Sequence, residues 1–306
     1  MTRHLHHVIN ERTSWDSFVQ IDDFSIKELQ FWITSLKSLP NCVLAPIQRL
    51  PERLAFTDVS SYAGAGYVVH FSYTSNIVHR MWTNEERLKS STWRELKAVV
   101  LTLKGFSDHF QNKFVKLFTD NQNVAHIYEV GSMKKDLHEL ALEILLFLYK
   151  KSIYLKIEWI PRNLNTVADE YSRIFDFDNW SVSDRIFHYF NKVWGPFTID
   201  RFANGNNTKL TLFNSKFSDP LTEGVDAFTF DWSRDNNWLV PPVSVLVHTI
   251  KHVQLCKTVG TLLVPKWKSA MFWPLLVSSI SGNLNKFVAE FIEYEKFSFQ
   301  QRKIYF

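Results

Sequence analysis

Three runs between residues 54 and 82 alternate apolar and polar positions with a period of two: "LAFTDVS", "AGYVVHF" and "NIVHRMW". Gly, Ser, Tyr and Asn residues between them favour turns, so the pattern predicts an antiparallel meander of three strands. In "STWRELKAVVLTLKGFSDHF" the apolar spacing becomes three to four residues, which predicts a helix with one apolar face. That face consists of Leu96, Val99, Val100, Leu103, Phe106 and Phe110.

Strands and helices alternate in the sequence that follows this helix. "KFVKLFTD" and "IYLKIEWI" have the composition of strands, whereas "NQNVAHIYEV", "DLHELALEILLFLYKK" and "NTVADEYSRI" have helical patterns. Three strands followed by alternating helices and strands are typical of an α/β domain with a mixed sheet flanked by helices. We place this domain at residues 51–176.

The segments on either side of this domain have different patterns. Residues 1–50 form a segment with one amphipathic helix, in which Ser25 and Glu28 match a capping box and Pro40 ends the helical pattern. Residues 177–306 are rich in Trp and Phe, and short apolar runs alternate with helices, which predicts a second, smaller α/β domain. In residues 1–50 the apolar positions at helical spacing are Ile26, Leu29, Ile33 and Leu36. They predict an amphipathic helix that needs a partner surface.

Composition narrows the class of protein. The 306 residues are 45% hydrophobic, which suits two cores better than one. A formal charge of +4 and a pI near 8.9 tolerate a polyanionic partner without identifying one. Cys42 and Cys256 lie far apart without metal-ligand spacing, which indicates a reducing compartment. Since no apolar run could cross a bilayer and the polar first residues lack a signal-peptide core, we expect an intracellular protein, in cytoplasm or nucleus, without membrane contact.

Four acidic residues stand at the ends of the predicted elements. Asp58 and Asp120 end the first and fourth strands, while Glu95 and Asp169 lie near the starts of helices. In a mixed sheet of this order the first and fourth strands are plausible parallel neighbours, which would bring Asp58 beside Asp120. Two adjacent carboxylates repel each other unless a cation lies between them.

Each of these acids also has a purely structural interpretation. Asp58 could form a turn, Thr92 and Glu95 match a capping box, Asp120 could cap the next helix, and Asp169 could complement a helix dipole. Four acids that converge on one sheet edge nevertheless favour a shared function.

Four segments carry a resemblance to a known family. "FTDVSSYAGAGYVV", "STWRELKAVVLTLKGF", "LFTDNQNVAHI" and "WIPRNLNTVADEYSR" resemble, in order and spacing, the successive motifs of a retroelement ribonuclease H domain. The resemblance implies hydrolysis of the RNA strand of RNA/DNA hybrids by two Mg²⁺ ions, with Mn²⁺ as an alternative. It implies that the ions are held by Asp58, Glu95, Asp120 and Asp169, with Asp58 bridging them. Carboxylates suit this chemistry, since hard cations prefer oxygen ligands and activate water.

The resemblance also indicates which residues contact nucleic acid. Ser60 and Ser61 follow Asp58 and could reach the 2′-hydroxyl groups of RNA, although a solvated turn explains them equally well. Asn123, Arg162 and Asn165 could hold phosphates, and Asn165 has an alternative role as a helix N-cap.

One position departs from the ribonuclease H pattern. Many relatives carry a histidine two residues before the proline of the loop that leads to the last Asp, and here Trp159 occupies that position. The four metal-binding acids remain, so this change bears on turnover and not on the metal site.

The last region carries a second resemblance. "DRFAN", "DAFTFDWS" and "WLVPP" resemble the pol polyprotein of DIRS-type retrotransposons, in which a domain similar to DNA adenine methyltransferases follows the ribonuclease H. The helix in residues 1–50 also resembles the connection segment that links the reverse transcriptase of these elements to the ribonuclease H. Such a context implies the reverse transcriptase and recombinase of the same element as partners. Methyl transfer needs Asn-Pro-Pro and an aromatic residue, but Val240 and Val243 flank the two prolines here. We therefore expect a degenerate domain with a structural or nucleic-acid-binding role.

Two hypotheses follow for the whole chain. The first is a metal-dependent endonuclease that acts on RNA/DNA hybrids. The second is a scaffold derived from such an element that binds nucleic acid without cutting it, which Trp159 and the degenerate last region favour.

Overall fold

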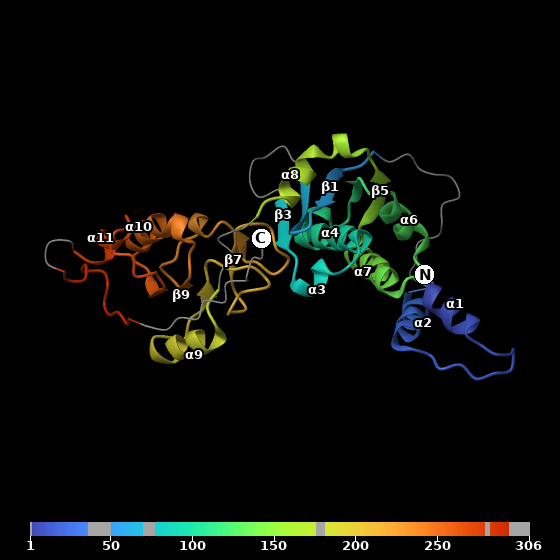
Figure 1. Ribbon diagram of the computed structural model, residues 1–306, viewed down its shortest axis with the longest axis horizontal. Coiled ribbons are helices and arrows are strands. Elements are labelled where there is room, and N and C mark those ends of the chain that lie inside the picture. The colour runs from blue at the N-terminus through green and yellow to red at the C-terminus, as the bar shows by residue number, and fades with distance from the viewer. Residues whose placement is uncertain (1, 36–49, 70–76, 176–180, 279–281, 294–306) are drawn as a thin grey trace. The chain divides into compact units, whose positions relative to one another are not determined.

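The computed structural model describes residues 2–35, 50–69, 77–175, 181–278 and 282–293. The chain divides into two compact units, Met1–Phe175 and Asp176–Phe306 (Figure 1). The domain limits expected from the sequence stay predictions, and each unit is described below by itself.

A five-stranded sheet in the order β3-β2-β1-β4-β5 forms the centre of the first unit. The central strand β1 is antiparallel to β2 and parallel to β4, β2 is antiparallel to β3, and β4 is parallel to β5. This sheet confirms the predicted mixed α/β architecture. The strands are β1 (Arg53–Val59), β2 (Ala63–Val69), β3 (Ile77–Met81), β4 (Phe114–Thr119) and β5 (Tyr154–Trp159).

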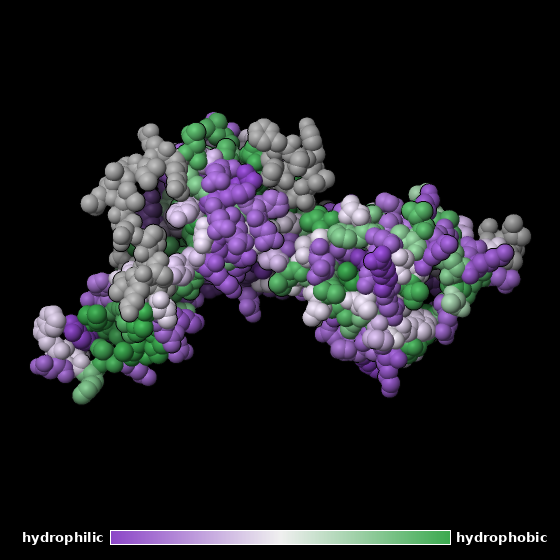
Figure 2. Space-filling model, turned by 180° about the vertical axis from the view of Figure 1, so that it is seen from behind, coloured by the Kyte–Doolittle hydropathy of each residue, from purple (hydrophilic) through white to green (hydrophobic). Residues whose placement is uncertain are grey.

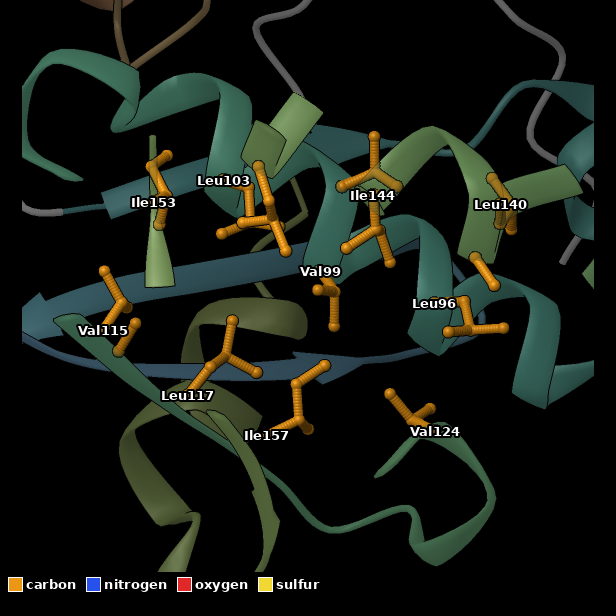
Figure 3. Packing of buried hydrophobic residues seen from close by; sticks show 14 of the residues in the cluster. Leu96, Val99, Leu103, Val115, Leu117, Val124, Leu140, Ile144, Ile153 and Ile157 are labelled. Carbon is orange, nitrogen blue, oxygen red and sulfur yellow. The ribbon is translucent and has the colours of Figure 1, made fainter. Parts of the chain in front are cut away.

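Helices of the first unit pack on the sheet through the apolar face that the sequence pattern predicts. Leu96, Val99 and Leu103 of one helix are buried with Val115 and Leu117 of β4 in a single core (Figure 3). Burial of such side chains is the main favourable contribution to folding. The helices after β3 are α3 (Asn84–Arg87), α4 (Ser91–Gly105), α5 (Ser107–Phe110), α6 (Gln122–Val130), α7 (Lys135–Lys151) and α8 (Thr166–Ser172), with the short 3-10 helix η1 (Arg162–Leu164).

A glycine in β2 allows this helix to approach the sheet closely. A Cβ atom at Gly66 would collide with the side chain of Thr102 on α4. The absence of a side chain inside this strand therefore has a packing reason.

Two N-terminal helices, α1 (Arg3–Asn10) and α2 (Asp23–Ser35), contact each other within the first unit. The predicted capping box is wrong, because α2 begins two residues before Ser25 and Asp22 Oδ1 accepts a hydrogen bond from the Ser25 amide at 2.8 Å. Ser25 and Glu28 lie inside the helix and are buried.

The polar side of α2 is the buried side. Glu28 Oε1 accepts hydrogen bonds from the His4 amide at 3.3 Å and from His138 Nε2 of α7 at 2.8 Å. The predicted apolar side is exposed instead, with Ile33 at 78% exposure. The end of the first unit that carries the N-terminal helices shows a hydrophobic patch on the face seen in Figure 2. These hydrogen bonds offset part of the cost of burying the Glu28 carboxylate. Leu36 and Pro40 lie outside the described residues.

The second unit contains a parallel three-stranded sheet in the order β10-β9-β6, which confirms the predicted second α/β domain. The side chains of Trp232 and Trp238 are fully buried, so both tryptophans belong to the hydrophobic core of the second unit. The strands are β6 (Ile199–Asp200), β7 (Asn214–Ser215), β8 (Gly224–Val225), β9 (Asn236–Leu239) and β10 (Val259–Leu262). The helices are α9 (Asp184–Val193), η2 (Ala227–Thr229), η3 (Val243–Val245), α10 (Leu246–Cys256) and α11 (Trp273–Leu276). Within the described parts of both units, every helix is too short or too polar to span a membrane.

Candidate metal centre

Three of the four predicted acids meet at one edge of the first unit's sheet. Asp58, Glu95 and Asp120 each contribute a carboxylate oxygen to a group whose members lie within 4.8 Å of one another. Asp58 is 2% exposed and Glu95 is 6% exposed, whereas Asp120 is partly buried. The three side chains come from β1, from α4 and from the residue after β4.

Asp58 lies inside β1 and pairs with Ala65 of β2, so the turn interpretation is wrong. Its Oδ2 atom accepts a hydrogen bond from the Ser172 hydroxyl of α8 at 3.0 Å. A backbone in regular strand geometry on one side and a hydroxyl donor on the other hold this carboxylate in place.

The capping interpretations of the next two acids are also wrong. Helix α4 is capped by Ser90, whose side chain accepts a hydrogen bond from the Trp93 amide at 3.2 Å, so Glu95 is the fifth helical residue and no cap. Helix α6 is capped by Asn121 instead of Asp120. Neither acid is needed to begin its helix, which leaves both available for a ligand.

Burial and mutual repulsion work against ionisation of these acids. Burial raises the pKa of Asp58 from 3.8 to about 6, and the neighbouring charge of Asp120 adds to the rise. Burial also raises the pKa of Glu95 well above its usual value, with Asp58 and Asp120 contributing. The pKa of Asp120 is raised by burial as well.

A divalent cation fits this group. Glu95 Oε2 is buried and has no hydrogen-bond partner among the described residues, although such an oxygen normally needs one. A cation between the three carboxylates would satisfy that oxygen and offset their repulsion. Because all the donors are carboxylate oxygens, the set suits Mg²⁺ or Mn²⁺ rather than an ion that prefers thiolate or imidazole ligands.

The fourth predicted ligand, Asp169 of α8, is not brought into this three-carboxylate group. Its Oδ1 atom accepts hydrogen bonds from Arg162 Nη2 and from Arg173 Nη2, both at 2.9 Å. Partial burial raises the pKa of Asp169, but these two hydrogen bonds outweigh it and the pKa is lowered. Asp169 is still near enough for its charge to raise the pKa of Asp58 and of Asp120.

The predicted nucleic-acid contacts occupy different environments. Ser61, between β1 and β2, and Asn123, on α6, are exposed. Arg162 forms the ion pair with Asp169 described above. The Ser60 hydroxyl donates to the Ser172 carbonyl at 2.6 Å and accepts from the Ala63 amide at 3.0 Å, so it holds the β1–β2 turn.

Asn165 is 1% exposed and donates from Nδ2 to the Thr57 carbonyl of β1 at 2.9 Å. Its side chain makes no capping hydrogen bond, so the N-cap interpretation is only positional. This buried amide attaches the start of α8 to the strand that carries Asp58.

Sequence reasoning missed the roles of three residues around the acids. Ser172 holds Asp58, Arg173 contacts Asp169, and Trp159 Nε1 donates to the Asp120 carbonyl at 2.9 Å. The first two belong to the quoted segment "NTVADEYSR", so that motif's serine and arginine were available as a signal. The Trp159 contact joins the ends of neighbouring strands and is visible only in three dimensions.

Two family models match successive parts of the chain. A model described as "Reverse transcriptase-like" matches residues 54–174, and one described as "DNA N-6-adenine-methyltransferase (Dam)" matches residues 173–282. No curated protein matches the chain significantly.

Several solved structures resemble part of the chain in fold. LC11 ribonuclease H1, from compost, in complex with an RNA/DNA hybrid, shares 14% identity over 39% of this chain and 93% of its own, with a TM-score of 0.34. Ribonuclease H1 from the halophilic archaeon Halobacterium salinarum shares 18% identity over 39% and 92%, with a TM-score of 0.33. The prototype foamy virus protease-reverse transcriptase shares 13% identity over 52% and 21%, with a TM-score of 0.28.

The cavity described in the second unit does not fit the S-adenosylmethionine that a methyltransferase model implies. The cavity beside Asp200 and Val240 has a volume of about 10 Å³, enough for about one water molecule. Arg201, 3% exposed, donates one hydrogen bond from each of its three side-chain nitrogens, to Asn237 Oδ1, Asn214 Oδ1 and Asp235 Oδ2.

Proposed function

We propose that the first unit is a metal-dependent endonuclease that hydrolyses the RNA strand of RNA/DNA hybrids. The observation that carries this proposal is the buried group of Asp58, Glu95 and Asp120, with an orphaned oxygen on Glu95. Structural roles as turn or cap residues do not account for these acids. The match of residues 54–174 to a reverse transcriptase-like family and the four motifs described above support the choice of substrate.

Asp58, Glu95 and Asp120 would hold two Mg²⁺ ions, or Mn²⁺, and Asp169 would complete the set. When bound, such ions lower the pKa of a water molecule and stabilise the leaving oxygen of a phosphodiester. The chain itself positions the ligands: Ser172 orients Asp58, and Trp159 fixes the backbone of Asp120. Ser61, Asn123 and Arg162 would contact the substrate backbone.

We place this nuclease in the reverse-transcription machinery of a DIRS-type retrotransposon. The supporting observation is the order of the two family matches, reverse transcriptase-like and then methyltransferase-like, on one chain. The reverse transcriptase and recombinase of the same element would be its partners, inside the cell. The second unit would serve as a structural or nucleic-acid-binding module.

A second function is a scaffold that binds hybrids without cutting them. Trp159 stands where relatives carry a histidine, and Asp169 is paired with two arginines, and both observations favour it. Hybrid binding whose affinity falls steeply with salt, without a metal-dependent product, would support the scaffold. An affinity insensitive to salt would count against it.

The test of the nuclease is cleavage of an end-labelled RNA/DNA hybrid by the purified chain in Mg²⁺ and in Mn²⁺. We expect shortened RNA, intact DNA and no product in chelator. Asp120→Asn should abolish the product, while Asp108→Asn, which alters a carboxylate 89% exposed on α5, should not. An intact hybrid with the folded wild-type chain in both metals would contradict the proposal.

A further inference from the structure

Two arginines converge on one oxygen of the fourth acid. Arg162 precedes α8 and Arg173 follows it, and both donate to Asp169 Oδ1 at 2.9 Å. The arginine side chains are 67% and 61% exposed, whereas that of Asp169 is 23% exposed. The charged ends of the arginines therefore lie at the surface, over the carboxylate that they hold.

These pairs are weak enough to be exchanged. Both arginine side chains are largely exposed, so water screens these ion pairs, and holding two long side chains in one geometry costs entropy. A phosphate group accepts two parallel hydrogen bonds from a guanidinium and is a stronger partner than a shared carboxylate oxygen. A nucleic-acid backbone at this surface would compete with Asp169 for both arginines.

A metal ion would also disfavour the position of Arg162. Burial raises the pKa of Glu95 and of Asp120; the charges of Arg94 and Arg162 oppose this rise at Glu95, and that of Arg162 opposes it at Asp120. Arg162 is held beside these acids by its 2.9 Å hydrogen bond to Asp169. A divalent cation between the three carboxylates would repel this guanidinium.

We propose that Arg162 and Arg173 couple metal binding to substrate binding. Without nucleic acid they hold Asp169 away from the metal centre, and on binding they transfer to backbone phosphates, which releases Asp169 as the fourth ligand. The inference rests on the proposed function, because it takes the acids as metal ligands and a nucleic acid as substrate. By linkage, the hybrid raises metal affinity by the same factor as metal raises hybrid affinity.

The experiment measures Mn²⁺ affinity by titration calorimetry, with and without a hybrid whose RNA strand carries non-hydrolysable linkages. In the wild type we expect the hybrid to tighten Mn²⁺ binding about tenfold or more, a coupling of the usual allosteric size. In the Arg162→Gln, Arg173→Gln double variant, Mn²⁺ should bind several-fold more tightly without hybrid and gain little from it. Hybrid affinity in chelator should fall, with a shallower salt dependence.

Asp169→Asn distinguishes release of this ligand from a general charge effect. If the arginines act through Asp169, replacing them in the Asp169→Asn background should leave the coupling unchanged, so the two changes are non-additive. Additive effects would overturn the proposal. The Arg87→Gln variant, which removes an exposed positive charge on α3, is the control for net charge. Thermal melting verifies that each variant is folded.

The outcomes separate this inference from the function on which it rests. Hybrid cleavage by the wild type together with additive variant effects refutes the coupling and leaves the nuclease standing. Absence of any Mn²⁺ binding to the folded wild type refutes both.

Discussion

Replacing Asp58 by asparagine removes a buried charge that lies close to two other acidic residues, Glu95 and Asp120. The rise in the pKa of Asp58 from 3.8 to about 6 corresponds to about 3 kcal/mol of lost stability when the group is ionised, since each tenfold change in proton affinity is about 1.4 kcal/mol. Because the folded pKa is the higher one, this loss is absent below pH 3.8 and complete once the pH has risen through about 6.

We therefore expect Asp58→Asn to stabilise the metal-free protein at pH 8. Because the pKa values of Glu95 and Asp120 are raised as well, these acids share the effect of the repulsion. We therefore expect a rise in melting temperature of about 5 °C, from roughly 2–4 °C per kcal/mol for a unit of this size. Asparagine can still accept the Ser172 hydrogen bond through its Oδ1 atom. The difference between variant and wild type should shrink steadily as the pH falls toward 4.

The assay is thermal unfolding in chelator and in Mg²⁺ between pH 4 and pH 8. Mg²⁺ should raise the melting temperature of the wild type and add less to the variant, because a ligand stabilises only the state that binds it. Asp108→Asn, on the exposed surface, serves as the matched control. It should melt like the wild type at each pH and gain as much stability from Mg²⁺ as the wild type does. A variant less stable than the wild type at pH 8, or a difference independent of pH, would refute the repulsion between these acids.

Two further predictions concern other parts of the chain. Glu28→Ala should destabilise the first unit by about 3 kcal/mol in urea unfolding, because it leaves two backbone amides and the buried His138 without their hydrogen-bond partner. The more conservative Glu28→Gln should cost less. An unchanged urea midpoint in Glu28→Ala would show that this carboxylate does not hold α1 and α2 together. S-adenosylmethionine should leave the melting curve unchanged, because Val240 lines a cavity far too small for it; a clear thermal shift with this cofactor would restore methyl transfer as a function of the second unit.

Strand and helix patterns predicted the first unit's sheet because they depend on local chemistry. The alternating runs correspond to β1, β2 and β3, and the strand order brings Asp58 beside Asp120 as expected. Each acid alone had a local interpretation as turn or cap. Only their distances to one another, together with the caps supplied by Ser90 and Asn121, remove those interpretations.

Partners that are polar and distant in sequence could not be predicted. Apolar spacing indicated that the side of α2 with Ile33 would pack on a partner surface, but Ile33 is exposed. Glu28 is buried instead, and His138, 110 residues later, contributes one of its hydrogen bonds. Hydrophobic periodicity predicts which apolar residues are buried. It cannot predict the burial of a polar residue whose hydrogen-bond partners come from distant parts of the sequence. The same limit applies to Asp169, whose arginine partners no pattern of apolar residues reports.

The central claim is that the acids at the sheet edge hold metal ions for cleavage of RNA in a hybrid. Single-turnover cleavage of a labelled hybrid, compared between the wild type and Asp120→Asn purified in parallel, tests it most directly. The account predicts a product that requires Mg²⁺ or Mn²⁺ and a rate at least about 100-fold lower in the variant, equivalent to ~2.7 kcal/mol of transition-state stabilisation. Equal rates for the two proteins, or no cleavage by the folded wild type in either metal, would contradict it.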